Sequence, residues 1–197
     1  FRNERKLFRV KDAFTDKDIF SLFPEKSNRK VVTQEEWNGD SWDAMEYGRD
    51  IDFSKPFLEQ ILELEKEIPI YNLNSKFMVN SPYSGNATGL KNCYLCFNSN
   101  FLENCMYGNG VDHSKDCIDN SHINHSEKCY ECFWMQNCYQ CYFTLLSADS
   151  RNLWFCRDCI GCNDCFGSIN LRKSSYCIFN KQYTKENYQK EIEKMCL

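Results

Sequence analysis

The sequence contains no apolar run long enough to cross a membrane, which argues against a membrane span within these residues. It also lacks a phosphate-binding glycine loop and a recognisable nucleophile–base pair, so no enzyme class is indicated. A net charge of −4 and an isoelectric point near 5.5 leave no positive excess for binding nucleic acid. The first residue is Phe rather than Met, so we expect an N-terminal segment to precede it.

Cysteine is absent from the first 92 residues and then recurs at a fixed spacing. Thirteen of the fourteen cysteines lie between Cys93 and Cys177, each a multiple of three residues from Cys93. A longer period of twelve residues joins the cysteines that lead each repeat: Cys93, Cys105, Cys117, Cys129, Cys141, Cys165 and Cys177, with Leu153 in the remaining position. Self-similarity at a fixed period is the signature of a repeat protein.

The residues that share the phase of the cysteines carry no charge from 93 to 177. They are small or apolar, mostly serine and cysteine, whereas the charged residues occupy the other two phases. A helix requires a period near 3.6 and a flat strand a period of 2, so neither explains this pattern. The pattern predicts a mainly β protein with a narrow parallel β-solenoid over 80–180. Each coil takes twelve residues and points an inward ladder of cysteine and serine into a dry core.

Two resemblances accompany this pattern. The twelve-residue period with every third residue inward resembles the β-helix of insect antifreeze proteins, in architecture only, since no Thr-x-Thr face repeats. A second resemblance rests on the motifs Arg2-Asn3-Glu4, Gln34-Glu35-Glu36-Trp37, Trp42-Asp43, Asp52-Phe53-Ser54-Lys55-Pro56-Phe57, Asn92-Cys93-Tyr94-Leu95, Ile178-Phe179-Asn180-Lys181 and Tyr183-Thr184-Lys185. Their order resembles a family of uncharacterised cysteine-rich proteins from candidate-phyla bacteria, which implies a bacterial source. That family looks as if it carries zinc-ribbon-like Cys-x-x-Cys pairs beside the rod, and none precedes Cys93 here.

The regions flanking the repeat predict caps for the solenoid. Residues 1–79 read as a small α+β meander, with a capping box at Thr33 and Glu36. Ser54 is expected to cap a helix from Lys55 to Ile68, whose apolar stripe would pack on the first coil. Residues 181–197 are expected to form a second capping helix that starts after Thr184. Caps are required because an open end exposes core and unpaired strand edges.

The cysteine spacing favours free thiols over disulfides. In the antifreeze rod, disulfides join inward positions six residues apart. Most leading cysteines here have Ser, Val, Ile, Met or Leu at that distance, Ser99 and Val111 among them. Buried reduced thiols predict a reducing, cytoplasmic compartment.

Two groups of possible metal ligands remain open. Cys156, Cys159, Cys162 and Cys165 form a C-x2-C-x2-C-x2-C run, which could hold zinc or an iron–sulfur cluster. All four keep the inward phase, so the structural interpretation is preferred, with metal binding or storage as the alternative. His113 and His125, twelve residues apart, are expected to stack on one face, with His122 on the same coil as His125.

An outward apolar ladder beside the leading cysteines is the best binding candidate. Its members recur every twelve residues: Tyr94, Met106, Ile118, Tyr130, Tyr142, Trp154, Phe166 and Ile178. If exposed, Tyr94, Tyr130, Tyr142, Trp154 and Phe166 would bind a protein partner or a sugar; alternatively, residues 1–80 cover them. A second column, Asn100, Asp112, Asn124 and Gln136, is expected to satisfy backbone groups at a corner. We therefore predict a structural or binding module with no cofactor. A solenoid enzyme acting on a polysaccharide is a further alternative.

Overall fold

A computed structural model describes residues 5–195 of the chain. The chain divides between Ser75 and Lys76 into two compact units, each described below by itself. The sequence pattern placed this boundary after residue 79.

The unit Arg5–Ser75 is a small α+β fold built from short elements. Strands β1 (Phe8–Lys11) and β2 (Asp18–Ser21) form an antiparallel pair, and β3 (Val31–Val32) pairs in parallel with β4 (Ile70–Tyr71). The helical elements are η1 (Glu25–Ser27), α1 (Gln34–Trp37), η2 (Ala44–Tyr47) and α2 (Phe57–Glu67). The buried side chains at its centre include Val10, Asp12, Val31, Val32 and Leu73.

The sequence predicted the start of α1 correctly and the start of α2 incorrectly. Thr33 and Glu36 form the expected capping box at the start of α1. The expectation for Ser54 was wrong, because α2 begins at Phe57 with Pro56 as its N-cap. Ser54 Oγ instead donates a 2.6 Å hydrogen bond to Asp52 Oδ1, so a local turn uses the hydroxyl that a cap would need. None of the eleven residues of α2 is buried, and the partner of its apolar face stays a prediction.

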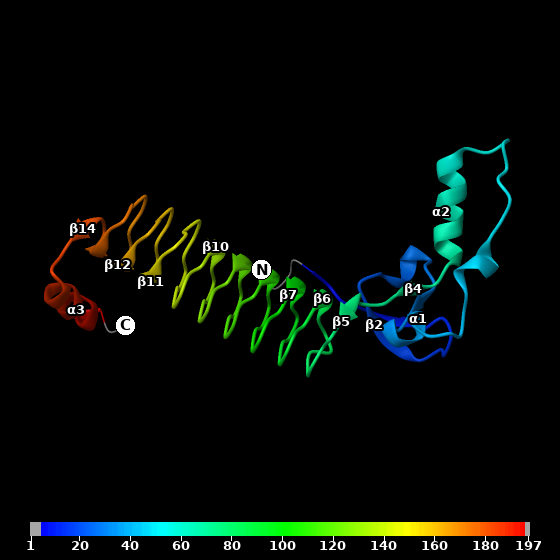
Figure 1. Ribbon diagram of the computed structural model, residues 1–197, viewed down its shortest axis with the longest axis horizontal. Helices are drawn as coiled ribbons and strands as arrows, with labels where there is room; N and C mark the ends of the chain where they lie inside the picture. The colour runs from blue at the N-terminus through cyan, green and yellow to red at the C-terminus, as the bar shows by residue number, and fades with distance from the viewer. Residues whose placement is uncertain (1–4, 196–197) are drawn as a thin grey trace. The chain divides into compact units, whose positions relative to one another are not determined.

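The second unit is the predicted parallel β-solenoid, with about nine turns at a spacing of twelve residues. Figure 1 shows its coils stacked along one axis. The first sheet contains β5 (Ser75–Lys76), β6 (Gly85–Thr88), β7 (Phe97–Asn100), β8 (Asn109–Asp112), β9 (Ser121–Asn124) and β10 (Phe133–Gln136). The second sheet contains β11 (Arg151–Trp154), β12 (Asn163–Phe166), β13 (Ser175–Ile178) and β14 (Lys181–Gln182). Every parallel pair joins residues twelve apart, such as Val111 with Ile123 and Cys165 with Cys177.

The strands change face half-way along the rod. The twelve-residue period would place a strand at 145–148 after β10, yet β11 begins six residues later at Arg151. Six residues are half a coil, so the two sheets lie on opposite sides of the same tube. Between them, the chain pairs only through isolated bridges such as Tyr139 with Arg151.

The C-terminal end is closed by a helix, as the sequence predicts. Helix α3 (Lys185–Lys194) begins after Thr184, whose side chain accepts a hydrogen bond from the Asn187 amide. Tyr188 of α3 is buried, with its ring centroid 5.9 Å from that of Tyr176 in β13. The antiparallel strand β14 pairs with β13 and ends the stack of parallel strands. Together, α3 and β14 cover the edge that the last coil would otherwise expose.

The interior is the ladder predicted from the cysteine phase. All seven leading cysteines are at most 2% exposed: Cys93, Cys105, Cys117, Cys129, Cys141, Cys165 and Cys177. Asn120, the polar exception on this phase, is also buried and makes two short hydrogen bonds. Some residues outside the phase are buried too, namely Phe97, Asn109, Asp119 and Ser121.

Backbone amides of inward residues explain why the interior is rich in serine and cysteine. The amide of Cys93 donates to Ser81 Oγ at 2.9 Å, and the amide of Cys159 donates to Ser147 Oγ at 3.1 Å. In both pairs, the acceptor is the inward side chain of the previous coil. The same side chains donate outward, as Ser147 Oγ does to the Leu145 carbonyl at 3.1 Å. An inward residue therefore acts as both acceptor and donor for the backbone.

The sulfur of an inward cysteine likewise accepts a hydrogen bond from one backbone amide and donates to backbone carbonyls. The Cys105 thiol donates to the carbonyls of Glu103 and Ser114, at 3.3 and 3.6 Å, and the amide of Cys117 lies against its sulfur. We expect Cys105→Ser to lower the free energy of unfolding by no more than about 1 kcal/mol, because a hydroxyl keeps these bonds. Cys105→Val should be worse by about 1–3 kcal/mol, because it leaves the amide without an acceptor. Urea unfolding followed by circular dichroism measures the difference in the free energy of unfolding. A valine variant as stable as the serine variant would show that the hydrogen bonds between the Cys105 side chain and the backbone do not stabilise the rod.

Candidate functional site

The predicted aromatic ladder is present on the solenoid and is wider than expected. Consecutive members of the ladder form isolated parallel bridges, such as Tyr94 with Met106 and Tyr130 with Tyr142. A second column, one residue further along each coil, adds rings beside it: Tyr107, Phe143, Phe155 and Phe179. The sequence analysis missed this column, although the same twelve-residue period would have revealed it. We call the two columns together, from Tyr94 to Phe179, the aromatic stripe.

Rings of the aromatic stripe contact one another along the rod in an alternating arrangement. Tyr142 stacks on Trp154 with centroids 4.2 Å apart, and Phe143 stacks on Phe155 at 4.9 Å with planes 2° apart. Edge-to-face contacts link the stacked pairs to their neighbours, at 5.3 Å from Tyr130 to Phe143 and 5.5 Å from Phe155 to Phe166. Such pairs stabilise by about 0.5–1.5 kcal/mol each beyond burial, so the rings are held in place by each other.

Exposure varies along the aromatic stripe. Tyr94, Phe143, Phe155 and Phe179 are 41%, 39%, 47% and 71% exposed, whereas Tyr130, Tyr142, Trp154 and Phe166 are half-buried. Ile178 departs from the expected outward ladder and is buried, because its strand, β13, is paired with β14 at the closed end of the rod. Whether residues 1–80 cover the stripe stays a prediction.

From Asn86 to Phe179, every third residue adopts a left-handed backbone conformation, one position before an inward residue. The φ angle is 53° at Asn92, 51° at Phe143 and 54° at Phe155. Asn, Asp and Gly tolerate this region best, and many of the positions carry them. Asparagines there also bond along the rod: Asn80 Nδ2 donates to Asn92 Oδ1, and Asn92 Nδ2 to Asn104 Oδ1, at 3.1 and 3.2 Å.

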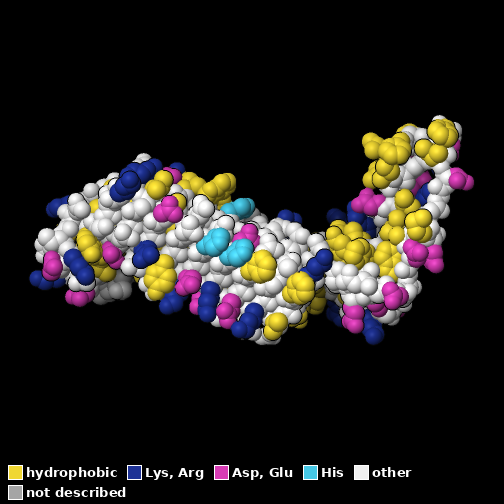
Figure 2. Space-filling model, viewed as in Figure 1, with side chains coloured by type: hydrophobic (Ala, Val, Ile, Leu, Met, Phe, Trp, Pro, Cys, Tyr) yellow, Lys and Arg dark blue, Asp and Glu magenta, His cyan; other side chains and the backbone are white. Residues whose placement is uncertain are grey.

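All three histidines lie on the solenoid (Figure 2), and His113 stacks on His125 as predicted. His113 and His125 stack with centroids 4.9 Å apart and planes 8° apart, and Phe101 extends the stack beyond His113. His122 lies apart from this pair and stacks on Trp134 at 5.9 Å. The histidines therefore form two separate ring contacts rather than one cluster.

The amide and carboxylate column satisfies the backbone over part of its length. Asp112 Oδ1 accepts from the amide of Asn100 at 2.8 Å and from its Nδ2 at 3.0 Å, as expected for a corner. Asn124 differs, because its buried Oδ1 has no hydrogen-bond partner among the described residues. Gln136 is exposed. Asp112 therefore satisfies a backbone amide of this column, and no such bond is seen within residues 5–195 for the side chains of Asn124 and Gln136.

The four-cysteine run occupies the four successive inward positions of one coil. Cys156, Cys159, Cys162 and Cys165 are all at most 1% exposed. In the described part of the chain, no group of three or more His, Cys, Asp or Glu side chains is arranged to hold a metal ion. A hydrogen bond with Cys156 lowers the pKa of Cys159 to about 6, and the pKa of Cys156 is raised by the same bond. Burial raises the pKa of Cys165 to about 12.

Comparison with protein-family models and with curated proteins finds no match to this chain. None of the helices within residues 5–195 has the length and apolar character needed to cross a membrane. The functional proposal therefore rests on the chain's own surfaces.

A glycine shapes the end of the aromatic stripe. Gly167 has φ 58°, and a Cβ there would lie 2.6 Å from Cε1 of Phe179 in the next coil. Gly161 has φ 65°, but a Cβ there would meet only Lys173 Cγ at 3.5 Å. We expect Gly161→Ala to cost about 1 kcal/mol for the left-handed conformation alone. Gly167→Ala should cost about 1–3 kcal/mol more because of the overlap.

Thermal and urea unfolding of the two alanine variants measure this difference. Adding Phe179→Ala removes the overlap and should return Gly167→Ala to the stability loss of Gly161→Ala. Equal losses for both single variants would show that Phe179 does not lie over Gly167.

The thirteen described cysteines are free thiols in the structure, and all are buried. Burial keeps alkylating reagents away from these sulfurs, and buried structural cysteines are inert for that reason. We therefore expect native protein to react slowly with iodoacetamide at these thirteen positions and quickly in denaturant. Cys196 lies outside the described residues. Metal analysis of protein purified without chelator checks the alternative: one equivalent of zinc or iron per chain, lost in Cys159→Ser/Cys162→Ser, would contradict the packing role.

Proposed function

We propose that the solenoid is a non-enzymatic binding module and that the aromatic stripe is the surface on which a protein partner docks. The observation that carries the proposal is the exposure of interlocked rings along one side of the rod, including Phe143, Phe155 and Phe179. Tyr, Trp, Phe and Met are the residues enriched at the centres of protein interfaces. Ten of the sixteen positions in the two columns of the stripe carry one of these four types.

Pre-ordered rings favour binding. Ordering a mobile side chain at an interface costs about 0.5–1.5 kcal/mol, and rings already held by stacking avoid much of that loss. Phe143 and Phe155 are held by each other and by their neighbours on both sides. The parallel hydrogen-bond ladder beneath them fixes the coils, so the stripe presents a rigid surface. A scaffold of this kind supports recognition without requiring a conformational change.

The free thiols of the core support a reducing, cytoplasmic location. The serine and cysteine side chains inside the rod stabilise the coils as free hydroxyls and thiols, because they donate hydrogen bonds to backbone carbonyls, as Cys105 and Ser147 do. Forming disulfides would remove the S–H donors that these carbonyls use.

A pair of double variants tests the docking surface. Phe143→Ser/Phe155→Ser removes two exposed rings from the aromatic stripe, and Phe101→Ser/Ile169→Ser removes two exposed apolar side chains from other columns. Sedimentation velocity first establishes whether wild-type protein associates with itself. The immobilised wild-type and variant proteins are then compared in an extract of the organism of origin. We expect one protein, or a second copy of the chain, to bind wild type and the control at least tenfold better than the stripe variant. Equal binding to all three, or none to any, would refute the proposal.

A further inference from the structure

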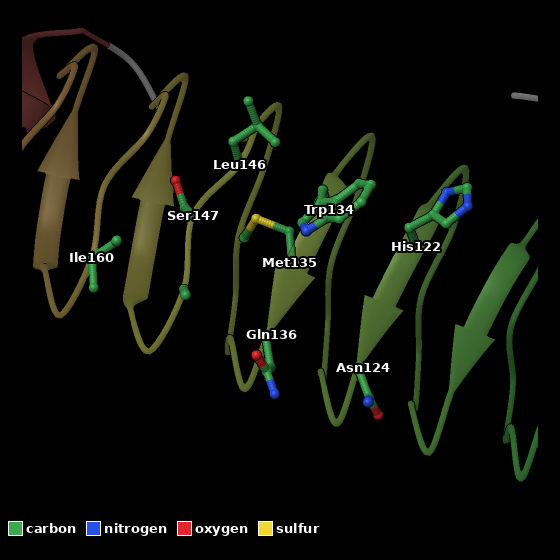
Figure 3. A pocket seen from close by; sticks show the side chains of 9 residues that line it. His122, Asn124, Trp134, Met135, Gln136, Leu146, Ser147 and Ile160 are labelled. Carbon is green, nitrogen blue, oxygen red and sulfur yellow. The ribbon is translucent and has the colours of Figure 1, made fainter.

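A groove of about 470 Å³ lies on the outside of the solenoid over β10, away from the aromatic stripe. Figure 3 shows Trp134 and Gln136 rising from the two ends of β10, with His122 and Asn124 in the same places on β9. On the next coil, Ala148 follows Asn124 and Gln136 in their column, and its small side chain leaves a notch before Ile160. The groove thus has an aromatic rim and an amide rim.

A second groove of about 380 Å³ lies on the following residues of the same coils. His125 and Asn137 line it, and they directly follow Asn124 and Gln136 in the chain. The two grooves have no lining residue in common, but neighbouring residues of the same two coils line them. Tyr139, Glu127 and Arg151 also line the second groove.

Gln136 is exposed, and the Asn124 side chain is partly exposed although its Oδ1 is buried without a hydrogen-bond partner among the described residues. Within the same part of the chain, neither Glu127 nor Arg151 forms an ion pair. Amide, carboxylate and guanidinium groups offer planar donors and acceptors that match pairs of neighbouring hydroxyls.

The apolar part of the groove contains one exposed aromatic ring, Trp134, with the side chains of Leu146 and Ile160 beside it. Trp134 is 62% exposed although His122 stacks on it with planes 16° apart. An indole of this kind suits a flat ring whose faces are C–H and whose rim is polar. Glu127 and Arg151 offset each other's charge, and Lys128 Nζ lies 5.9 Å from the Tyr139 ring. No charged side chain lines the groove over β10 itself.

We infer that the two grooves between Trp134 and Tyr139 bind a neutral polysaccharide, with one pyranose ring against Trp134 and its hydroxyls bonded to the side-chain amides of Asn124 and Gln136. A pyranose has the C–H faces and the rim of donors and acceptors that this arrangement matches. Nucleic acid is disfavoured, because the groove over β10 contains no cation to pair with phosphate. This site is independent of the aromatic stripe and of the proposed protein partner.

Affinity electrophoresis tests the site with native full-length protein. Gels contain one neutral polysaccharide each: hydroxyethyl cellulose, mixed-linkage β-glucan, xylan or galactomannan, with polygalacturonate as the anionic comparison. We expect at least one neutral polysaccharide to slow the wild-type protein. Trp134→Ala should weaken that binding at least tenfold. Trp154→Ala removes the same side chain from the aromatic stripe and should leave it unchanged, which separates this site from the proposed docking surface.

Three results would overturn the inference: no retardation by any neutral polysaccharide, retardation by polygalacturonate alone, or equal retardation of wild type and Trp134→Ala. Circular dichroism establishes that each variant is folded. Should Trp134→Ala fail to fold, Gln136→Ala replaces an exposed side chain on the opposite rim and is expected to show the same loss.

Discussion

Backbone amides that point into the tube are the constraint on which this solenoid depends. At the corners of a coil, an amide directed inward has no water and needs an acceptor. The side chain of the previous coil supplies it, as Ser84 does for Cys96 and Asn120 does for Cys132. Aliphatic inward residues are found mainly in the strands: Ala87, Val111, Ile123, Met135 and Leu153. Strands also use this device where they carry serine, since the amide of Val111 in β8 donates to Ser99 Oγ in β7 at 3.1 Å.

The periods of three and twelve were sufficient to predict much of this architecture. They predicted which residues point inward, the twelve-residue register between coils, the stacking of His113 on His125 and the apolar ladder that begins at Tyr94. Each of these depends only on which residues lie twelve apart. The same reasoning explains why Thr184 could be identified as a helix cap, since a cap is a local signal.

Features that depend on side-chain volume or on competing local bonds could not be predicted. The period does not say which side of the coil forms strands, so the change of face between β10 and β11 was not foreseen. Nor does it show that Phe97 and Asp119, on outward phases, are buried. The groove depends on the small size of Ala148 beside the larger Gln136. The cap expected from Ser54 was lost to its bond with Asp52.

The left-handed positions of the rod carry several bulky aromatic residues, and their conformational cost has to be offset by contacts. A residue other than Gly, Asn or Asp in this conformation costs roughly 1–2 kcal/mol, and most for bulky side chains. Trp134, Phe143, Phe155 and Phe179 all have φ between 46° and 55°. Stacking offsets the cost for Phe143 and Phe155, which contact each other. Trp134 is mostly exposed and has His122 as its stacked neighbour, so folding gains little from it. Lys128, Glu131 and Gln140 have the same conformation, so the geometry of the coil imposes it, and exposure rather than strain sets Trp134 apart.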